Sequence, residues 1–167
     1  VAAMDIVSEI AHYLVANESL FTFTDTQEIC RYNPKTGLYE QDGKHYIKQR
    51  MQVMADRSGH PKVASTWHCN ETTEMIRRLT MINRRDIEAD PDLVCLANGV
   101  LNSATGELFP FDPKFKFFSK LAVAYDPAAA CPKIEEFVST VLGDQVELFF
   151  EVVGSTLRRE NREQKAT

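Results

Sequence analysis

The stretch LANGVLNSATGELFPFD (residues 96–112) decides how the middle of the chain folds. It holds two turn signals, Asn98-Gly99 and Thr105-Gly106, which cannot both be the tip of one hairpin. The order Asn-x-x-Thr-Gly at Asn102–Gly106 repeats that of Asn33–Gly37, where Asn-Pro-Lys-Thr-Gly predicts a four-residue hairpin loop on a type I turn. We therefore place the tip of a hairpin over about residues 93–112 at Asn102–Gly106. Asn98-Gly99 then lies inside its first strand, where glycine commonly marks a bulge or a close backbone approach.

Helices and short strands are predicted before this hairpin. Residues 4–16 have apolar side chains at helical spacing, and residues 21–25 (FTFTD) alternate as a strand does. Strands at 28–32 and 37–41 flank the first hairpin loop. The apolar spacing becomes helical again from Lys44 up to a breaker at residues 59–61, and Asn70 is a natural N-cap for a third helix over residues 70–80.

Two further helices are predicted after the hairpin. Pro132 begins the first and Gly143 ends it, with an apolar stripe formed by Ile134, Phe137, Val138, Val141 and Leu142. Asp144 then caps a last helix, with Glu147 in the capping-box position. We expect this helix to bury Phe149, Phe150 and Val153 and to run out into residues 158–167.

These elements predict an α+β fold of helices with short antiparallel β-hairpins, winged-helix-like in the middle and ending in a helical connector. Three segments follow from the pattern: an N-terminal helix and hairpin (1–43), a basic helical cluster with a hairpin (44–125), and the helical connector (126–167). The length of 167 residues and the 44% hydrophobic content are those of a globular chain.

Composition and motifs argue against several classes of protein. The start of the chain does not resemble a signal peptide, no apolar run is long enough to span a bilayer, and the four cysteines are isolated, which favours an intracellular, cytoplasmic location. His60, His68 and Cys69 lack the partners that a closed zinc site needs, so we expect no metal site. No phosphate loop, GxGxxG, GxSxG or HExxH occurs. We therefore expect that this chain alone catalyses nothing and needs no cofactor.

The charge of the chain is unevenly distributed. Residues 44–85 contain nine basic and three acidic residues, whereas the whole chain has a net charge of −5. A face that meets phosphates would need such an excess, although an ordinary solvated surface can have one too.

Three segments resemble a known family in their order and spacing. LANGVLNSATGELFPFD, AVAYDPAAACPKIEEFVSTVLGD and the tail RENREQKA resemble the domain before the helicase core of phage, plasmid and poxvirus-like primase-helicases, which carry a superfamily 3 ring ATPase. The resemblance covers residues 90–167 well and the first 60 residues loosely. It implies a parent protein in which a Walker A loop follows Thr167, with ATP and Mg²⁺ bound there. The implied partners are DNA, the parent's helicase core and further subunits of a ring, inside the host cell if the parent is viral or plasmid-borne.

The resemblance also implies a role for the basic run. Helices followed by a hairpin have the order of a winged-helix module, in which a helix and a wing contact DNA. The proposed wing tip at residues 103–107 has no Lys or Arg, and Glu107 would repel phosphate. We therefore predict that DNA contacts lie on the basic helices, at Lys48, Arg50, Arg77, Arg78, Arg84 and Arg85. Base stacking on Trp67, Phe115, Phe117 or Phe118 is weighed against a place for these rings in the core.

Three functions follow as hypotheses. The first is a DNA-binding and ring-assembly region of a replicative helicase, which supports unwinding by the parent protein. The second is an oligomerisation collar without DNA contact, in which acidic and basic faces of neighbouring subunits meet. The third is a free-standing winged-helix regulator.

Overall fold

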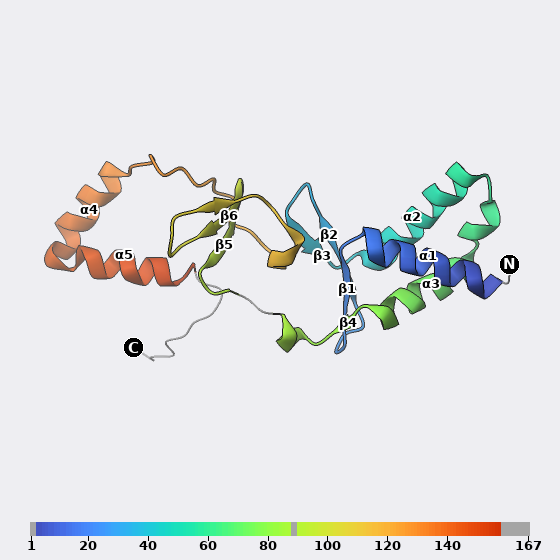
Figure 1. The fold of residues 1–167 in the computed structure, drawn as a ribbon. Coiled ribbons are helices and arrows are strands. Elements are labelled where there is room, and N and C mark those ends of the chain that lie inside the picture. The colour runs from blue at the N-terminus through green and yellow to red at the C-terminus, as the bar shows by residue number, and fades with distance from the viewer. Residues whose placement is uncertain (1–2, 88–89, 158–167) are drawn as a thin grey trace. The chain divides into compact units, whose positions relative to one another are not determined.

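The computed structural model describes residues 3–87 and 90–157, which form two compact units (Figure 1). Unit 1 comprises Val1–Glu88 with Asp112–Phe118, and unit 2 comprises Ala89–Phe111 with Ser119–Thr167. The described residues contain five α-helices and seven strands, so the predicted α+β class is confirmed. The basic helices and the second hairpin pack in different units. The division into three segments and the winged-helix-like arrangement remain predictions.

Three helices of unit 1 pack around one apolar core. They are α1 (Ala3–Asn17), α2 (Gly43–Ser58) and α3 (Thr66–Leu79), with the short 3-10 helix η1 (Pro61–Ala64) between the last two. The buried side chains include Leu14 of α1, Ile47 and Met51 of α2, and Ile76 of α3. These are the apolar positions that helical spacing predicts.

The ends of α2 and α3 have identifiable causes. Gly59 ends α2 in the left-handed conformation (φ 69°), which glycine adopts without steric cost. The predicted cap of α3 at Asn70 was wrong, because the helix begins at Thr66 and Asn70 lies inside it. Ser65 is the N-cap instead: its hydroxyl accepts the backbone N–H of His68. The apolar side chains of α3 begin one turn after its first residue, so their spacing places the predicted start of the helix too late.

The sheet of unit 1 has the strand order β3-β2-β1-β4. β1 (Leu20–Phe23), β2 (Ile29–Asn33) and β3 (Leu38–Glu40) are antiparallel neighbours, and the β2–β3 hairpin is the one that the sequence predicts. β4 (Met81–Ile82) pairs with β1 in parallel. Thr22 lies opposite Met81, so the end of α3 is brought beside the end of β1. The parallel pair was not predicted, because its partners lie far apart in the sequence.

Both Asn-x-x-Thr-Gly loops form the turns that the sequence predicts. In each, the glycine N–H donates to the backbone carbonyl of the asparagine at 2.8 Å, and both glycines have φ 74°. The side chain of Asn33 accepts the N–H of Lys35 at 3.0 Å, and that of Asn102 accepts the N–H of Ala104 at 2.9 Å. The tip predicted at Asn102–Gly106 is therefore confirmed.

The sheet of unit 2 is a three-stranded antiparallel meander of β5 (Leu93–Leu96), β6 (Gly99–Asn102) and β7 (Leu108–Phe109). Leu96 pairs with Gly99, so Ala97 and Asn98 are themselves a two-residue hairpin loop. The predicted place of Asn98-Gly99 inside one strand was wrong: the two turn signals close two successive hairpins. The predicted close approach at Gly99 is confirmed, since a Cβ there would lie 2.5 Å from the carbonyl oxygen of Phe109. Asn98 also holds the backbone at Tyr125, because its side-chain N–H donates to the Tyr125 carbonyl oxygen and its side-chain oxygen accepts the Tyr125 N–H, both at 2.9 Å.

Helices α4 (Pro132–Leu142) and α5 (Val146–Ser155) follow in unit 2, joined by the 3-10 helix η4 (Gly143–Gln145). The predicted N-cap at Asp144 was wrong, since Gln145 occupies that position and makes no capping bond through its side chain. The extension of α5 into residues 158–167 lies outside the described residues.

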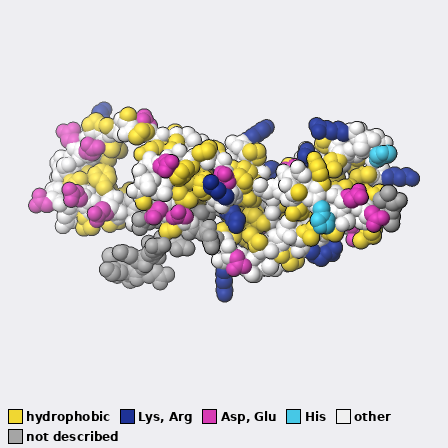
Figure 2. Space-filling view, in the orientation of Figure 1, with side chains coloured by type: hydrophobic (Ala, Val, Ile, Leu, Met, Phe, Trp, Pro, Cys, Tyr) yellow, Lys and Arg dark blue, Asp and Glu magenta, His cyan; other side chains and the backbone are white. Residues whose placement is uncertain are grey.

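The expected burial of Phe149, Phe150 and Val153 in α5 is wrong, since all three side chains are more than a third exposed. Within α4 only Val138 is buried, whereas Phe137 is 68% exposed, and Phe149 and Phe150 of α5 are 38% and 39% exposed. Figure 2 shows hydrophobic and acidic side chains gathered over these helices. The apolar side of an amphipathic helix is buried only where another surface formed by the described residues packs against it.

Candidate nucleic-acid interface

Two of the predicted arginines hold the turn between β1 and β2. Arg77, in the last turn of α3, donates its Nε to the carbonyl oxygen of Gln27 at 3.0 Å. Arg84, in the 3-10 helix η2 (Arg84–Asp86) after β4, donates its Nε to Oδ2 of Asp25 at 3.1 Å. The parallel pairing of β4 with β1 places both arginines beside this turn. The side chains of Thr24 and Asn83 add a hydrogen bond of 2.9 Å across the same place.

Two more predicted arginines are the immediate neighbours of these. Arg78 and Arg85 are exposed, and neither has an ion-pair partner among residues 3–87 and 90–157. Arg85 lines a hollow of about 610 Å³ together with Arg84, Asn83 and the turn residues Thr24 and Asp25, and Asp86 completes the lining. We call Arg77, Arg78, Arg84 and Arg85 the arginine cluster.

Acidic side chains partly neutralise the cluster. Arg77 pairs with Glu74 one turn earlier on α3, and Arg84 pairs with Asp25. The hydrogen bond from Arg84 holds the pKa of Asp25 below its usual range. The Asp25–Arg84 pair is about half exposed on both sides. Exposed pairs of this kind contribute little to stability, so a phosphate can compete for the guanidinium.

The structure does not join Lys48 and Arg50 to the cluster. Both lie on α2, where Arg50 donates to Glu18 at 3.0 Å and the Tyr46 hydroxyl donates to the same carboxylate at 2.8 Å. Lys48 is half-buried near Cys69, whose pKa is raised by burial and lowered again in part by this positive charge. Of the six predicted DNA-binding residues, Arg77, Arg84 and Arg85 therefore lie beside the β1–β2 turn, and Arg78 follows Arg77 in α3.

The aromatic residues that are weighed for base stacking differ in their exposure to solvent. Phe117 is 5% exposed and is a core residue, whereas Trp67 and Phe118 are 47% and 39% exposed. Trp67 stands at the start of α3, about 15 Å along the helix from Arg77 at the usual rise per residue. Phe118 packs against Phe23, over whose ring the guanidinium of Arg84 lies at 3.8 Å. Sequence reasoning missed this arginine–aromatic contact, because only the parallel β1–β4 pair creates it.

The proposed wing presents no cationic group at its tip. The loop between β6 and β7 is exposed, and Ser103 donates its hydroxyl to the carbonyl oxygen of Asp92 at 2.9 Å. Its charged residue is Glu107. That the hairpin is a poor contact for DNA stays a prediction.

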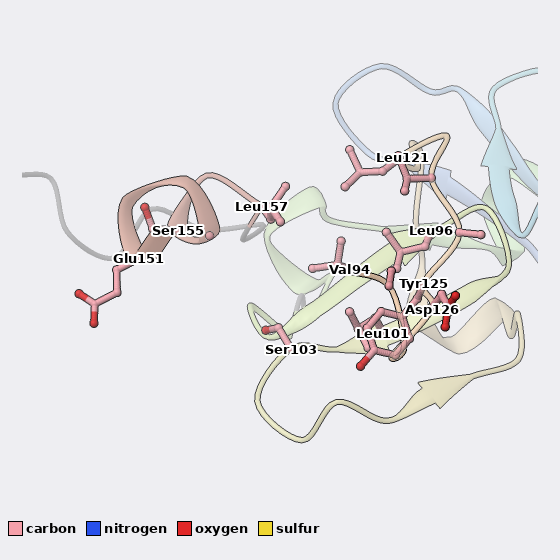
Figure 3. A pocket seen from close by; sticks show the side chains of 14 residues that line it. Val94, Leu96, Leu101, Ser103, Leu121, Tyr125, Asp126, Glu151, Ser155 and Leu157 are labelled. Carbon is pink, nitrogen blue, oxygen red and sulfur yellow. The ribbon is translucent and has the colours of Figure 1, made fainter. Parts of the chain in front are cut away.

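Unit 2 has an apolar pocket of about 710 Å³ (Figure 3). Val94, Leu96 and Leu101 of the sheet line it, together with Leu121 and, from just beyond α5, Leu157. The picture shows Glu151 pointing away from these side chains. The lining is mostly aliphatic, which suits contact with another apolar surface better than binding of an ionic ligand.

Within the described residues, no group of three or more His, Cys, Asp or Glu side chains is placed to hold a metal ion. No described helix has the length and hydrophobicity to cross a membrane. Cys30, Cys69 and Cys95 are buried, and Cys131 is exposed.

Comparison with known proteins gives the family of the chain. A family model described as D5 N terminal like matches residues 17–143, which is well over half of the chain. The search of curated proteins found no match. The matched region includes the whole arginine cluster and both hairpin loops. The resemblance seen in the sequence is thereby confirmed: the chain belongs to the D5 N-terminal-like family, whose domain is found in primase-helicases of phages, plasmids and poxviruses.

Proposed function

We propose that unit 1 binds DNA through the arginine cluster and so supports unwinding by a parent primase-helicase. The observation that carries this proposal is that Arg77 and Arg84 contact the β1–β2 turn and that Arg85 lines the hollow beside it, with Arg78 next to Arg77 in the sequence. Arg78 and Arg85 have no ion-pair partner among the described residues, and Arg84 holds a half-exposed pair with Asp25. The Arg77 side chain is 19% exposed and pairs with Glu74.

Physical reasoning favours a polyanion as the ligand. Four cationic groups close together repel one another, and phosphates relieve that repulsion while counterions leave the nucleic acid. Arginine also suits this role because its planar fork donates two hydrogen bonds to one phosphate. Within the parent, ATP and Mg²⁺ would belong to the helicase core, and the protein would act inside the cell, in the cytoplasm where the replicating DNA lies.

The test is a pair of double variants with the same change in net charge. Arg78→Glu with Arg85→Glu reverses the unpartnered half of the cluster, and Lys44→Glu with Lys62→Glu reverses two exposed lysines of unit 1 outside it. The full chain is titrated with a labelled oligonucleotide, with fluorescence anisotropy as the readout. We expect the first variant to lose affinity by at least about tenfold at 0.1 M salt and the second to lose much less. Equal losses in both variants would reject the cluster as the site.

The surface of α4 and α5 favours a second role in protein contact. These helices expose Phe137, Val141 and Leu148 by more than half, and carry four acidic residues beside one lysine. Contiguous apolar surface of this kind is typical of protein interfaces. We propose that it meets the parent's helicase core or a neighbouring subunit of a ring. Self-association of the chain in light scattering, abolished by Phe137→Gln with Val141→Gln, would favour the subunit, and a monomer would favour the core.

A further inference from the structure

We infer that the ligand of the arginine cluster is single-stranded DNA, with a base stacked on Phe118. This inference rests on the proposed function. It adds that the bound DNA is single-stranded and names the side chain that contacts an unpaired base. The surroundings of Phe118 differ from those of Trp67, the other exposed aromatic residue weighed for base stacking.

Phe118 lies on a preformed aromatic surface. Its ring centroid is 5.8 Å from that of Phe23 in a stacked arrangement and 6.0 Å from that of Phe21 in an edge-on one, and Tyr39 lies at 6.1 Å. These three neighbours are at least nine-tenths buried, whereas 39% of Phe118 is exposed. The ring is thus packed against buried neighbours and partly exposed to solvent, which leaves little conformational entropy to lose when a base stacks on it.

Phe23 joins this ring to the arginine cluster. The Arg84 guanidinium lies 3.8 Å from the centroid of Phe23, so Phe118 and this cation are no more than 9.6 Å apart, the sum of their separations from that ring. Arg85 follows Arg84 directly and is exposed without an ion-pair partner among the described residues. An aromatic face beside cations that follow a phosphate backbone is the arrangement by which proteins bind single strands without reading sequence.

A duplex would not use this feature. Its base faces are covered by neighbouring base pairs, so a flat aromatic ring gains nothing from them unless the helix opens. The acidic neighbours Asp25 and Asp86 also limit the net positive charge of the site, which weakens purely electrostatic binding. An added stacking contribution compensates for this only with unpaired bases.

The test distinguishes binding through the bases from binding through the phosphates. The full chain and its Phe118→Leu variant are titrated with oligo(dT) of about 16 nucleotides, an abasic strand with the same number of phosphates, and a blunt duplex. Leucine keeps apolar contact with Phe21 and Phe23 but removes the π face. Trp67→Leu is the matched control, because it removes an aromatic ring of similar exposure from the far end of α3.

We expect Phe118→Leu to weaken binding of oligo(dT) by at least about fivefold and to leave the abasic strand and the duplex within about twofold of the wild type. Trp67→Leu should change none of the three. An unchanged affinity for oligo(dT), or an equal loss on the abasic strand, would overturn the inference. If Arg78→Glu with Arg85→Glu still weakens binding in that case, the proposed DNA-binding function stands and only the stacking fails. If neither variant weakens binding, both fail.

Discussion

Replacing Gly43 with alanine tests how α2 is seated on the sheet of unit 1. Gly43 is the first residue of α2 and is buried against β2, where a Cβ would lie 2.5 Å from the backbone oxygen of Ile29 and 2.7 Å from its Cγ2. The contact with the oxygen is 0.9 Å closer than the 3.4 Å at which ordinary contact begins. Because one of the atoms is backbone, the helix or the strand must shift.

The expected cost follows from two opposing contributions. Overpacking of this kind costs about 1–3 kcal/mol, and the better helix propensity of alanine returns up to about 1 kcal/mol. We therefore expect the free energy of unfolding to fall by about 1–2 kcal/mol. The urea midpoint then falls by roughly 0.5–1 M at the slopes usual for small domains.

Trp67, the sole tryptophan, lies in unit 1, so its fluorescence follows the unfolding of that unit during a urea titration. Lys44→Ala is the matched control, since the neighbouring lysine is exposed and its loss should change the free energy of unfolding by less than about 0.5 kcal/mol. A Gly43→Ala protein as stable as the wild type would refute the close packing of α2 on β2. The positions of Lys48 and Arg50 would then need revision too.

Three further outcomes are expected. Burial raises the pKa of Tyr39 from 10.0 to about 12. The unfolded chain therefore loses the Tyr39 proton first, and the free energy of unfolding falls as the pH rises through 10. In urea titrations, Tyr39→Phe should remove about 1 kcal/mol of the fall seen between roughly pH 8 and 11, and an equal fall in both proteins would contradict this. Gly106→Ala forces alanine to φ 74° and should cost roughly 1 kcal/mol, seen as faster hydrogen exchange of the β6–β7 amides; unchanged exchange would argue against the turn. In thermal denaturation, Phe137→Gln should change the free energy of unfolding of α4 by less than about 0.5 kcal/mol, whereas Val138→Gln should lower it by more than about 1 kcal/mol. Equal effects of the two substitutions would contradict the orientation of the helix.

Local patterns in the sequence predict the elements whose causes are local. The loops at Asn33–Gly37 and Asn102–Gly106 are specified by residues within each loop, and both form as expected. The error at Asn98-Gly99 has a local reason too. A single hairpin was assumed, whereas two residues are enough to connect antiparallel strands, so a second hairpin fits into the same stretch.

Features that depend on distant residues were not predictable in this way. The basic run suggested a contact for nucleic acid, but only the parallel pairing of β1 with β4 brings Arg77 and Arg84 to one turn. Similarly, the apolar stripes of α4 and α5 predict burial but say nothing of what covers them. Among the described residues, these stripes are largely uncovered.

The most direct test of the DNA-binding proposal is the salt dependence of binding. Each phosphate neutralised on a single strand contributes about −0.7 to the slope of log Kobs against log salt concentration. Four arginines on four phosphates therefore predict a slope of about −2.8 for the wild type, and of about −1.4 for Arg78→Glu with Arg85→Glu. A slope near zero in the wild type, or the same slope in both proteins, would contradict the proposal that the arginine cluster binds DNA.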